Sequence, residues 1–279
     1  MRAKVLRVAA ALVSLLVAGQ SDLAAARPKK NVEIVMVDPK AAGIGEVELA
    51  DGALVTAAQQ SFGSGGFAAL QAHLPALGGV LARAPADYPR IVSGKGLIIA
   101  RGHEAQGMAL MLGIMSAQGA GAGKIRLAGT PNVYPDAALL LGSNANEYGR
   151  HEEALAYLDR GLALQPDELP LLIEKSGTLT VLLRPAEALT TVDAALAAAG
   201  GEGADLRARL LRRRGLALIE LQRLDEAEKA LKESLALVPD DRLTLNELDY
   251  IAALRAGATP TPPVMAPKTP APIQDDVTT

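Results

Sequence analysis

Three adjacent residues, His151, Glu152 and Glu153, carry the side chains that acid–base catalysis and metal binding use most often. They open the stretch GRHEEALAYLDRGLALQP, which reads as the start of a helix. A zinc-protease motif needs a second histidine four residues after the first, where this chain has Leu155. Acidic side chains in a first turn favour the helix dipole instead. We therefore interpret the triplet as the polar start of a packed helix.

A second candidate acid–base pair is His103-Glu104. Apart from these two motifs the sequence has only His73, so a metal site would consist mainly of carboxylates, and none cluster. There is no cysteine nucleophile, and no serine stands in the strained turn of a hydrolase. We expect no catalytic residues, no metal and no cofactor, and a protein that is not an enzyme.

Two glycine-rich stretches resemble anion-binding loops but lack the full motifs. SFGSGGF (61–67) precedes a helix, yet no clear strand leads into it, so we expect a flexible connection. QGAGAGK (118–124) has Gln118 where a phosphate-binding loop has its first glycine, and Ile125 where it has serine or threonine. We reject the second stretch as a nucleotide site.

Charge and composition exclude several classes of partner. The chain has 28 basic and 31 acidic residues, and residues 1–26 hold three of the basic ones but a single acidic one. The rest of the chain, residues 27–279, is therefore acidic, and an acidic chain is a poor ligand for nucleic acid. With no tryptophan, five tyrosines and two phenylalanines, a platform that stacks bases or sugars is not expected.

The two ends of the sequence have patterns of their own. Residues 1–26 combine a basic start, an apolar run over 8–18 and small residues up to Ala26, which is typical of a secretory signal peptide. The apolar run is shorter than the ~20 residues of a spanning helix. We expect cleavage after Ala26 and a periplasmic or secreted protein without stable membrane insertion. The proline-rich residues 257–279 predict a disordered tail.

A repeat organises the middle of the chain. The pair Glu-Ala recurs at 153–154, 187–188 and 226–227, with spacings of 34 and 39 residues. This period and its small and large residues resemble the tetratricopeptide repeat. The first unit matches that family at Gly142, Ala154, Leu158, Gly161 and Pro166, and the third at Gly215, Ala227, Leu231, Ser234 and Pro239. The middle unit is degenerate, with Ser176, Ala188, Ala195 and Gly200 at these places.

The resemblance implies a mainly α-helical solenoid over 135–256, with about three helix pairs and a capping helix. Small residues let paired helices approach closely, and stacked units form a concave face. The capping helix is expected over 242–257, with Arg255 in its last turn and Gly257 as the residue that ends it. A small α/β segment over 27–130 precedes the solenoid.

Within 27–130 the patterns predict individual strands and helices but resemble no family. Strands are expected over 31–38 and 124–129, two more around a glycine-containing turn in 90–101, and helices over 67–84, interrupted or bent at Pro75, and over 103–120. A degenerate helical repeat over 49–85 is the alternative. Against it, the glycines between 63 and 66 would interrupt its first helix.

The family resemblance also implies where a partner binds. In tetratricopeptide proteins the concave face is lined by fixed positions of the first helix of each unit, the earliest of which is Asp136 in this chain. The other candidates on that face are Leu139, Ser143, Asn146, Glu147, Ile173, Thr180, Arg209, Arg212, Arg213 and Leu216. Such a mixture of apolar and charged groups suits a protein segment or peptide.

Five arginines between Arg207 and Arg214 allow two interpretations. Arg209 and Arg213 resemble half of a clamp with which some family members hold a peptide's terminal carboxylate, but Leu139 and Ser143 replace the lysine and asparagine of the other half. The run could dock an acidic partner through bidentate pairs. The alternative, which we favour, is a solvated face paired with acids such as Asp205 and Glu220.

The sequence thus favours an exported scaffold that binds a protein or peptide along its concave face. One alternative is a small ligand-binding or hydrolase-like α/β domain that the repeats position. Another is a structural subunit of an envelope assembly. Neither the partner nor self-association follows from the sequence.

Overall fold

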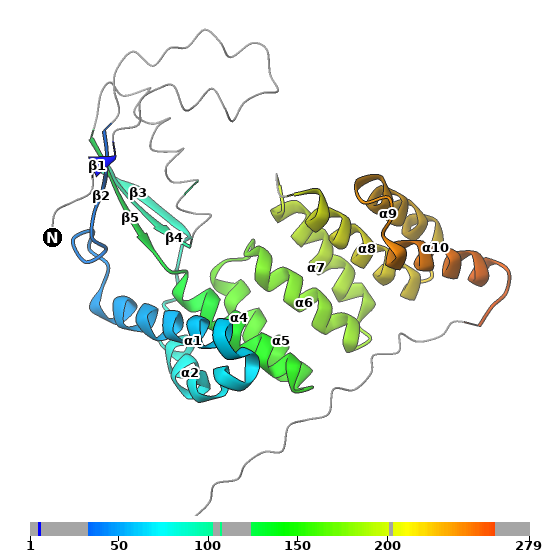
Figure 1. The fold of residues 1–279 in the computed structure, drawn as a ribbon, viewed down its shortest axis with the longest axis horizontal. Helices are drawn as coiled ribbons and strands as arrows, with labels where there is room; N and C mark the ends of the chain where they lie inside the picture. Colours follow the sequence, from blue (N-terminus) through cyan, green and yellow to red (C-terminus); the bar gives the residue numbers. More distant parts are fainter. Residues whose placement is uncertain (1–4, 7–32, 103–106, 108–123, 201–202, 260–279) are drawn as a thin grey trace, which may run out of the picture.

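The computed structural model describes residues 5–6, 33–102, 107, 124–200 and 203–259 (Figure 1). The helix expected over 103–120, with the pair His103-Glu104, lies outside the described residues except for residue 107. The QGAGAGK stretch, the tail and the predicted signal peptide also lie almost entirely outside them. In the described part, a β-sheet stands at one end of a stack of helices (Figure 1).

The sheet has five strands in the order β1-β2-β5-β4-β3. They are β1 (Val5–Leu6), β2 (Glu33–Met36), β3 (Ile91–Gly94), β4 (Leu97–Arg101) and β5 (Lys124–Thr130). The central strands β2, β5 and β4 are parallel, and the edge strands β1 and β3 are antiparallel to their neighbours. The strands predicted over 31–38, 90–101 and 124–129 are confirmed, whereas β1 was not expected.

A two-residue turn joins β3 to β4. Lys95 and Gly96 have φ angles of 47° and 72°, the left-handed values that a type I′ turn requires. Gly94 and Leu97 are paired directly across the turn. The glycine-containing turn predicted in this stretch is confirmed.

Residues 46–82 form a helix pair, α1 (Glu46–Leu70) and α2 (Leu74–Ala82), separated by the 3-10 turn η2 (Gln71–His73). The interruption expected at Pro75 is therefore confirmed. The expectation of a flexible connection over 61–67 was wrong, because α1 runs through this stretch and departs from helical geometry only at Gly66 (φ 61°, ψ −152°).

Burial explains why α1 tolerates its glycines. Each glycine costs about 1 kcal/mol relative to alanine in a helix, but Val55, Ala58 and Leu70 are fully buried in a cluster with Leu77 of α2 and Tyr134. Apolar burial of this kind contributes about 1.5–3 kcal/mol for each large side chain. Packing against the neighbouring helices therefore outweighs the local preference of the glycines.

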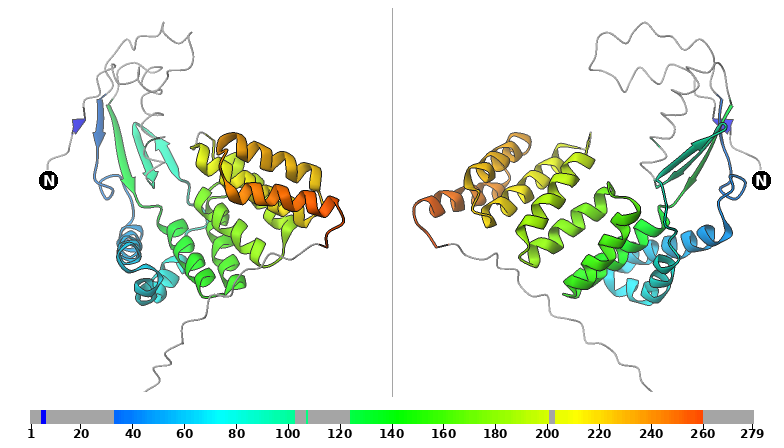
Figure 2. Two further views of the ribbon diagram at one scale, coloured as in Figure 1. Left: turned by 45° about the vertical axis from the view of Figure 1, so that its right-hand side comes forward. Right: turned by 180° about the vertical axis from the view of Figure 1, so that it is seen from behind.

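Six helices then follow as three antiparallel pairs. They are α4 (Val133–Glu147) with α5 (His151–Leu164), α6 (Leu169–Val181) with α7 (Pro185–Ala198), and α8 (Ala204–Glu220) with α9 (Leu224–Leu237). The pair α1–α2 lies beside α4 and α5 in all three views (Figures 1 and 2). The helical alternative for 49–85 is thus realised as a further pair, and the hairpin and β5 come between α2 and α4.

Small residues allow the close approach within and between pairs. A Cβ atom on Gly142 would lie 2.8 Å from Leu158, and one on Gly215 would lie 2.6 Å from Leu231. A Cβ atom on Gly161 would lie 2.7 Å from Leu171 of the next pair. The packing role predicted for these glycines is confirmed.

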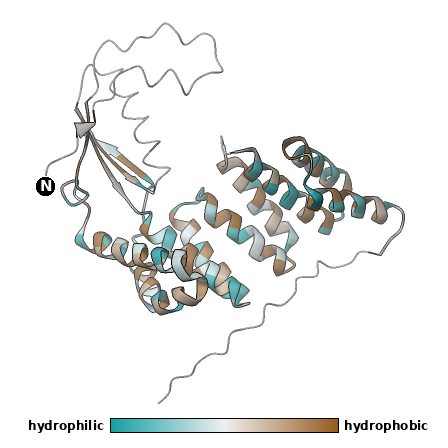
Figure 3. Cartoon of the chain, in the orientation of Figure 1, coloured by the Kyte–Doolittle hydropathy of each residue, from teal (hydrophilic) through white to brown (hydrophobic). Residues whose placement is uncertain are grey.

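The last helix, α10 (Arg242–Arg255), covers α9, as predicted. Asp241 caps it by accepting a hydrogen bond from the Leu243 backbone N–H, and Gly257 beyond its end has a φ of 92°. Polar residues are more frequent on the helices of this end than on α4 to α7 (Figure 3). Within the described ranges, no helix combines the length and apolarity needed to cross a membrane.

Candidate partner-binding face

The triplet His151 to Glu153 begins α5, as predicted, and its members contact neighbouring residues of the stack. His151 Nδ1 lies 3.1 Å from the Asn146 side-chain oxygen, and Glu153 accepts a hydrogen bond of 2.9 Å from Arg150. Glu152 lies 3.6 Å from Arg184 of the next pair. Nowhere in the part of the chain that the structure describes do three acidic or histidine residues gather as metal ligands.

The predicted groove residues lie on α4, α6 and α8, the first helices of the three pairs. On α8, Arg209, Arg212, Arg213 and Leu216 follow the spacing i, i+3, i+4, i+7 and so share one helix face. We call the surface formed by the candidate residues on these three helices the first-helix face. Leu139, Ser143, Asn146 and Glu147 of α4 and Ile173 and Thr180 of α6 complete it.

Asn146 connects α4 to α6. Its amide nitrogen lies 2.8 Å from both Glu174 Oε1 and Thr178 Oγ1, while its oxygen faces His151 across 3.1 Å. The side chain therefore bridges two successive first helices and the start of α5. A substitution here changes the geometry of the face as well as its chemistry.

Arg213 connects α8 to α6 in a similar way. Its Nη1 donates to the backbone oxygen of Ile173 at 2.6 Å and to Ser176 Oγ at 2.9 Å. Burial, with the positive charges of Arg212 and Arg209 nearby, lowers the pKa of the Arg213 guanidinium, and the charge of Glu174 opposes this shift. Arg213 thus spans the interface between the last two first helices.

Arg212 belongs to the cap of the stack. Its Nη1 lies 2.8 Å from Asp241 Oδ2, which also accepts a 2.6 Å hydrogen bond from Thr244 Oγ1. The hydrogen bond from Thr244 and the Arg212 guanidinium lower the pKa of the Asp241 carboxyl. This ion pair fixes the start of α10 against α8.

Arg209 is the exposed cation of the first-helix face. Among the described residues its side chain forms no ion pair or hydrogen bond, in contrast to Arg212 and Arg213. The other members of the face are half-buried, namely Leu139, Ser143, Asn146, Glu147, Ile173, Thr180 and Leu216. Whether these residues bind a partner stays a prediction.

The arginine run has other partners than the acids we expected. Arg214 pairs with Asp193 of α7 at 2.8 Å, and Arg212 pairs with Asp241, so both reach across to neighbouring helices. Neither Asp205 nor Glu220 takes part in an ion pair that the structure records. Charge pairing in this run therefore holds the helices together, which its sequence alone did not indicate.

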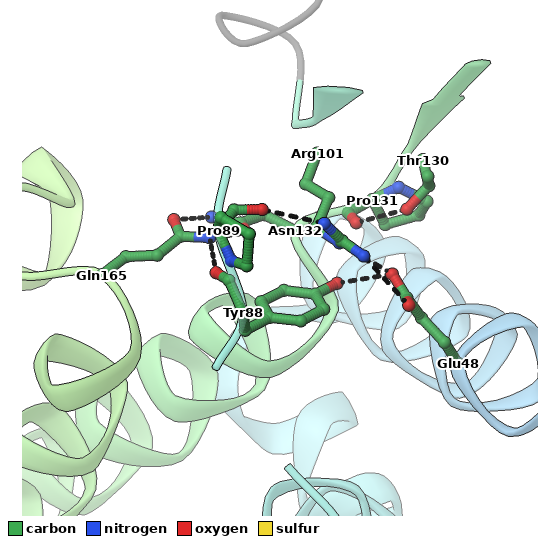
Figure 4. A network of polar contacts seen from close by, with 8 residues as sticks. All are labelled: Glu48, Tyr88, Pro89, Arg101, Thr130, Pro131, Asn132 and Gln165. Carbon is green, nitrogen blue, oxygen red and sulfur yellow. Dashed lines mark hydrogen bonds and ion pairs between the residues drawn. The ribbon is translucent and has the colours of Figure 1, made fainter. Parts of the chain in front are cut away.

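A polar network that no sequence pattern predicted lies where the sheet meets the stack (Figure 4). Glu48 of α1 accepts hydrogen bonds from Arg101 Nε at 2.9 Å and from the Tyr88 hydroxyl at 3.0 Å. Arg101, whose exposed fraction is 8%, also lies over the Tyr88 ring, 4.2 Å from its centroid. Burial and the Glu48 charge raise the pKa of Tyr88. This network ties β4 to α1.

The same junction is held on its other side by side-chain amides. Asn132 and Gln165 exchange two hydrogen bonds of 2.9 and 2.8 Å, and Gln165 also donates to the backbone oxygen of Tyr88 (Figure 4). Arg90 pairs with Glu168 at 2.7 Å. The ring of Tyr88 meets that of Tyr134 edge-on, with 4.7 Å between centroids.

Ser61 and His73 form a second contact that the sequence did not reveal. Ser61 Oγ lies 2.8 Å from His73 Nε2, between α1 and the turn η2. A serine–histidine pair has the types of a hydrolytic dyad, but Ser61 stands inside a helix rather than in a strained turn. The geometry is that of a helix–helix contact, and no cleft that the structure records converges on it.

Asp136, on the first helix α4, has a carboxyl group whose pKa is strongly shifted. Burial raises the pKa of its carboxyl to about 7, although Gln59 of α1 donates a 3.1 Å hydrogen bond to it. The charge of Glu168 acts in the same direction as burial. This residue lies where α1 packs on α4, so α1 covers the earliest position of the predicted groove.

A comparison with protein families agrees with the third unit of the repeat. Residues 208–241 match the family model described as tetratricopeptide repeat. The chain is 28% identical to the first such domain of Spaghetti (RPAP3), which is bound to the HSP90 peptide SRMEEVD; the match covers 43% of this chain and 93% of that one, with a TM-score of 0.38. The first domain of human RPAP3 gives 28% identity over 44% of this chain and 94% of that one, with a TM-score of 0.39.

A third similar structure is MamA from Desulfovibrio magneticus RS-1, with 24% identity over 44% of this chain and 66% of that one and a TM-score of 0.40. No curated protein matches the chain. The third helix pair, α8–α9, coincides with the matched residues 208–241. The protein therefore contains a tetratricopeptide repeat at 208–241, within a stack of antiparallel helix pairs.

Proposed function

We propose that this protein is a non-enzymatic scaffold that binds a segment of another protein along the first-helix face. The observation that carries the proposal is Arg209, an exposed cation without a partner in the described residues, on the same side of α8 as Arg212 and Arg213. A guanidinium in this position is available for a bidentate pair with a carboxylate of the partner.

The remaining chemistry of the face supports an extended segment or a helix as the ligand. Leu139, Ile173 and Leu216, one from each first helix, are half-buried and offer apolar contacts along the stack. Asn146 and Arg213 already hold neighbouring helices together, so they give the face its shape. A pre-formed face of this kind binds without a large ordering cost.

The test compares two arginines on opposite sides of the same helix. Affinity capture from the native source uses the purified protein, an Arg209→Ala variant and an Arg207→Ala variant as baits. Arg207 is also exposed, and its side chain has no ion pair or hydrogen bond with a described residue, but it lies two residues away and so points to another side of α8. We expect the partner to be lost from the first variant and kept by the second.

Both variants should unfold at the same temperature as the parent, because neither side chain holds a contact within the described residues. Capture of the same partner by all three baits would contradict the assignment of the first-helix face. A partner lost from both variants would show that overall positive charge, rather than this face, is responsible.

We also propose that the protein is exported after cleavage at Ala26, on the strength of the pattern in residues 1–26. Cleavage there removes β1, a two-residue edge strand, and leaves the pairing of β2, β5, β4 and β3 untouched. The mass of the protein purified from its native source tests this. A mass that includes residues 1–26 would contradict it.

A further inference from the structure

One face of the sheet is buried, and the other is open beside the β3–β4 hairpin, although Val35 and Ala128 on that side are buried. Ile34, Ile98 and Leu127 belong to a buried cluster on one side. Because side chains alternate along a strand, Leu97 and Ile99 of β4 point to the opposite side. We call that side, formed by Val92, Leu97, Ile99 and Arg126, the open sheet face.

A pocket of about 360 Å³ lies on the open sheet face. Its floor is apolar, with Val92 40% exposed and Leu97 and Ile99 half-buried. Gly94 also lines the pocket, and a Cβ atom at this glycine would meet nothing within 4 Å. The pocket therefore has room for an apolar side chain above the hairpin.

β3 is the edge of the sheet beside this pocket. The Arg101 backbone N–H donates to the Arg90 oxygen at 2.9 Å, and hydrogen-bonded pairs alternate with non-bonded pairs in an antiparallel ladder. The backbone groups of Val92 and Gly94 therefore face β4, and those of Ile91 and Ser93 face outward. An edge with outward N–H and C=O groups is a template for a further strand.

Two cations border the pocket. Lys95 in the turn and Arg126 of β5 are exposed, and neither forms a side-chain hydrogen bond or ion pair with any described residue. At the junction below, by contrast, Arg90 and Arg101 are both paired with glutamates. Within the described ranges, the unpaired positive charge at this end of the sheet thus lies beside the pocket.

We propose that β3 and the open sheet face bind an extended acidic and apolar segment of another protein, which adds to the sheet beside β3. Its backbone pairs with Ile91 and Ser93, an apolar side chain enters the pocket, and carboxylates pair with Lys95 and Arg126. Residues 91–101 contain no acidic side chain, so a second copy pairing through β3 would bring two basic hairpins together. This site is separate from the first-helix face.

The test uses fluorescein-labelled peptides and fluorescence anisotropy with the full chain. The acidic peptide is Thr-Glu-Thr-Val-Thr-Glu-Thr, which places its valine and both glutamates on one face of a strand, and its matched control has lysine in place of each glutamate. We expect the acidic peptide to bind at least tenfold more tightly than the lysine peptide, because charge complementarity favours it. Its affinity should also fall as the salt concentration rises.

A proline substitution separates edge pairing from simple charge attraction. Ser93→Pro removes an outward N–H without removing a hydrogen bond to β4, whereas Ser93→Ala keeps that N–H. We expect Ser93→Pro to lower the affinity for the acidic peptide at least tenfold and Ser93→Ala to leave this affinity unchanged. Hydrogen exchange of β4 amides shows whether the hairpin stays intact.

If the proline disturbs the hairpin, charge substitutions provide a second test. The double variant Lys95→Glu/Arg126→Glu should lower the affinity for the acidic peptide at least tenfold, whereas Lys229→Glu on distant α9 should leave it unchanged. Arg209→Ala should leave peptide binding unchanged, which distinguishes this site from the first-helix face. No binding, equal binding of both peptides, or binding that none of these hairpin variants affects would overturn the proposal. Self-association abolished by Ser93→Pro, without peptide binding, would also overturn it and assign the edge to a second copy.

Discussion

Asp136 is a half-buried carboxylate whose ionisation opposes folding. Its pKa is about 7 in the folded protein and about 4 in an unfolded chain. A group whose pKa is higher in the folded than in the unfolded state stabilises the folded protein fully at pH values below its unfolded-state pKa. This stabilisation is lost as the pH rises through the folded-state pKa. The parent protein should therefore lose stability between pH 4 and pH 7, and change little above.

Asp136→Asn removes this ionisation and should leave stability at pH 4 nearly unchanged. At pH 8 the variant should be more stable than the parent by about 1–2 kcal/mol, because the side chain is only partly buried and water weakens the effect. Urea unfolding at the two pH values measures the difference. Asp249→Asn, at an exposed site on α10, is the control, and an equal effect in both variants would contradict the explanation.

Two helical glycines should respond to alanine with opposite signs. A Cβ atom on Gly215 would lie 2.6 Å from Leu231, whereas one on Gly177 would lie 3.6 Å from Arg213. Gly215→Ala should lower the free energy of unfolding by about 1–3 kcal/mol through overpacking. Gly177→Ala should raise it by about 0.5–1 kcal/mol, because alanine has the higher helix propensity. Denaturant unfolding measures both changes, and two changes of the same sign would refute the packing argument.

Residue types that set close packing could be predicted from the sequence, but their polar partners could not. Gly142 and Gly215 stand at fixed places of the repeat, and only a small residue fits there. The partners of Arg213 and Asn146 lie 28 to 40 residues away on α6. They depend on how successive pairs are rotated, which no local pattern encodes.

At the scale of elements, α10 depends on one side chain at its start. Asp241 caps the helix and also binds Arg212 and Thr244. Asp241→Ala should destabilise α10 by about 1–2 kcal/mol, with faster hydrogen exchange at residues 244–255 as the measurement. Asp240→Ala, next to it and exposed, should leave the exchange unchanged. Uniform loss of protection throughout the stack would mean that Asp241 stabilises more than α10.

The sheet should loosen from the stack when Glu48 loses its charge. Glu48→Gln leaves the buried Arg101 guanidinium without its carboxylate partner, which costs on the order of 2–4 kcal/mol. Amides of β4 and β5 should then exchange faster than those of α8. Glu46→Gln is a matched control on the same turn, because Glu46 pairs with exposed Lys40 and with no other residue that the structure describes. Equal exchange in both variants would show that the ion pair does not hold the sheet.

Alternation and turn signals were sufficient to predict β2 to β5, because the strands are short and the hairpin has a glycine in its turn. The helix over 46–70 was predicted only in part, through the alternative of a helical repeat over 49–85, since a glycine-rich stretch disfavours a helix locally and only tertiary burial of residues such as Val55 compensates. The junction network was missed for a related reason. Glu48, Tyr88 and Arg101 are far apart in the sequence and have no recognisable spacing.

At the scale of the whole molecule, the buried core continues without a break from α1–α2 into α4. Val55 and Leu77 share one cluster with Tyr134 and Leu141. A fragment that begins at Pro131 would expose the face of α4 that α1 and α2 cover. We expect it to melt at least 5 °C below the full chain and to aggregate more readily. Calorimetry and light scattering measure this, and equal melting would show that the later pairs fold independently.

The joint between sheet and stack also gives the protein a natural optical reporter. With no tryptophan, its ultraviolet emission comes from five tyrosines, two of which, Tyr88 and Tyr134, face each other at that joint. The Tyr88 hydroxyl bonded to Glu48 and the adjacent Arg101 place one of these fluorophores in an unusual polar setting. Changes in emission intensity and anisotropy on adding a ligand would therefore register movement of the sheet relative to the helices without any label.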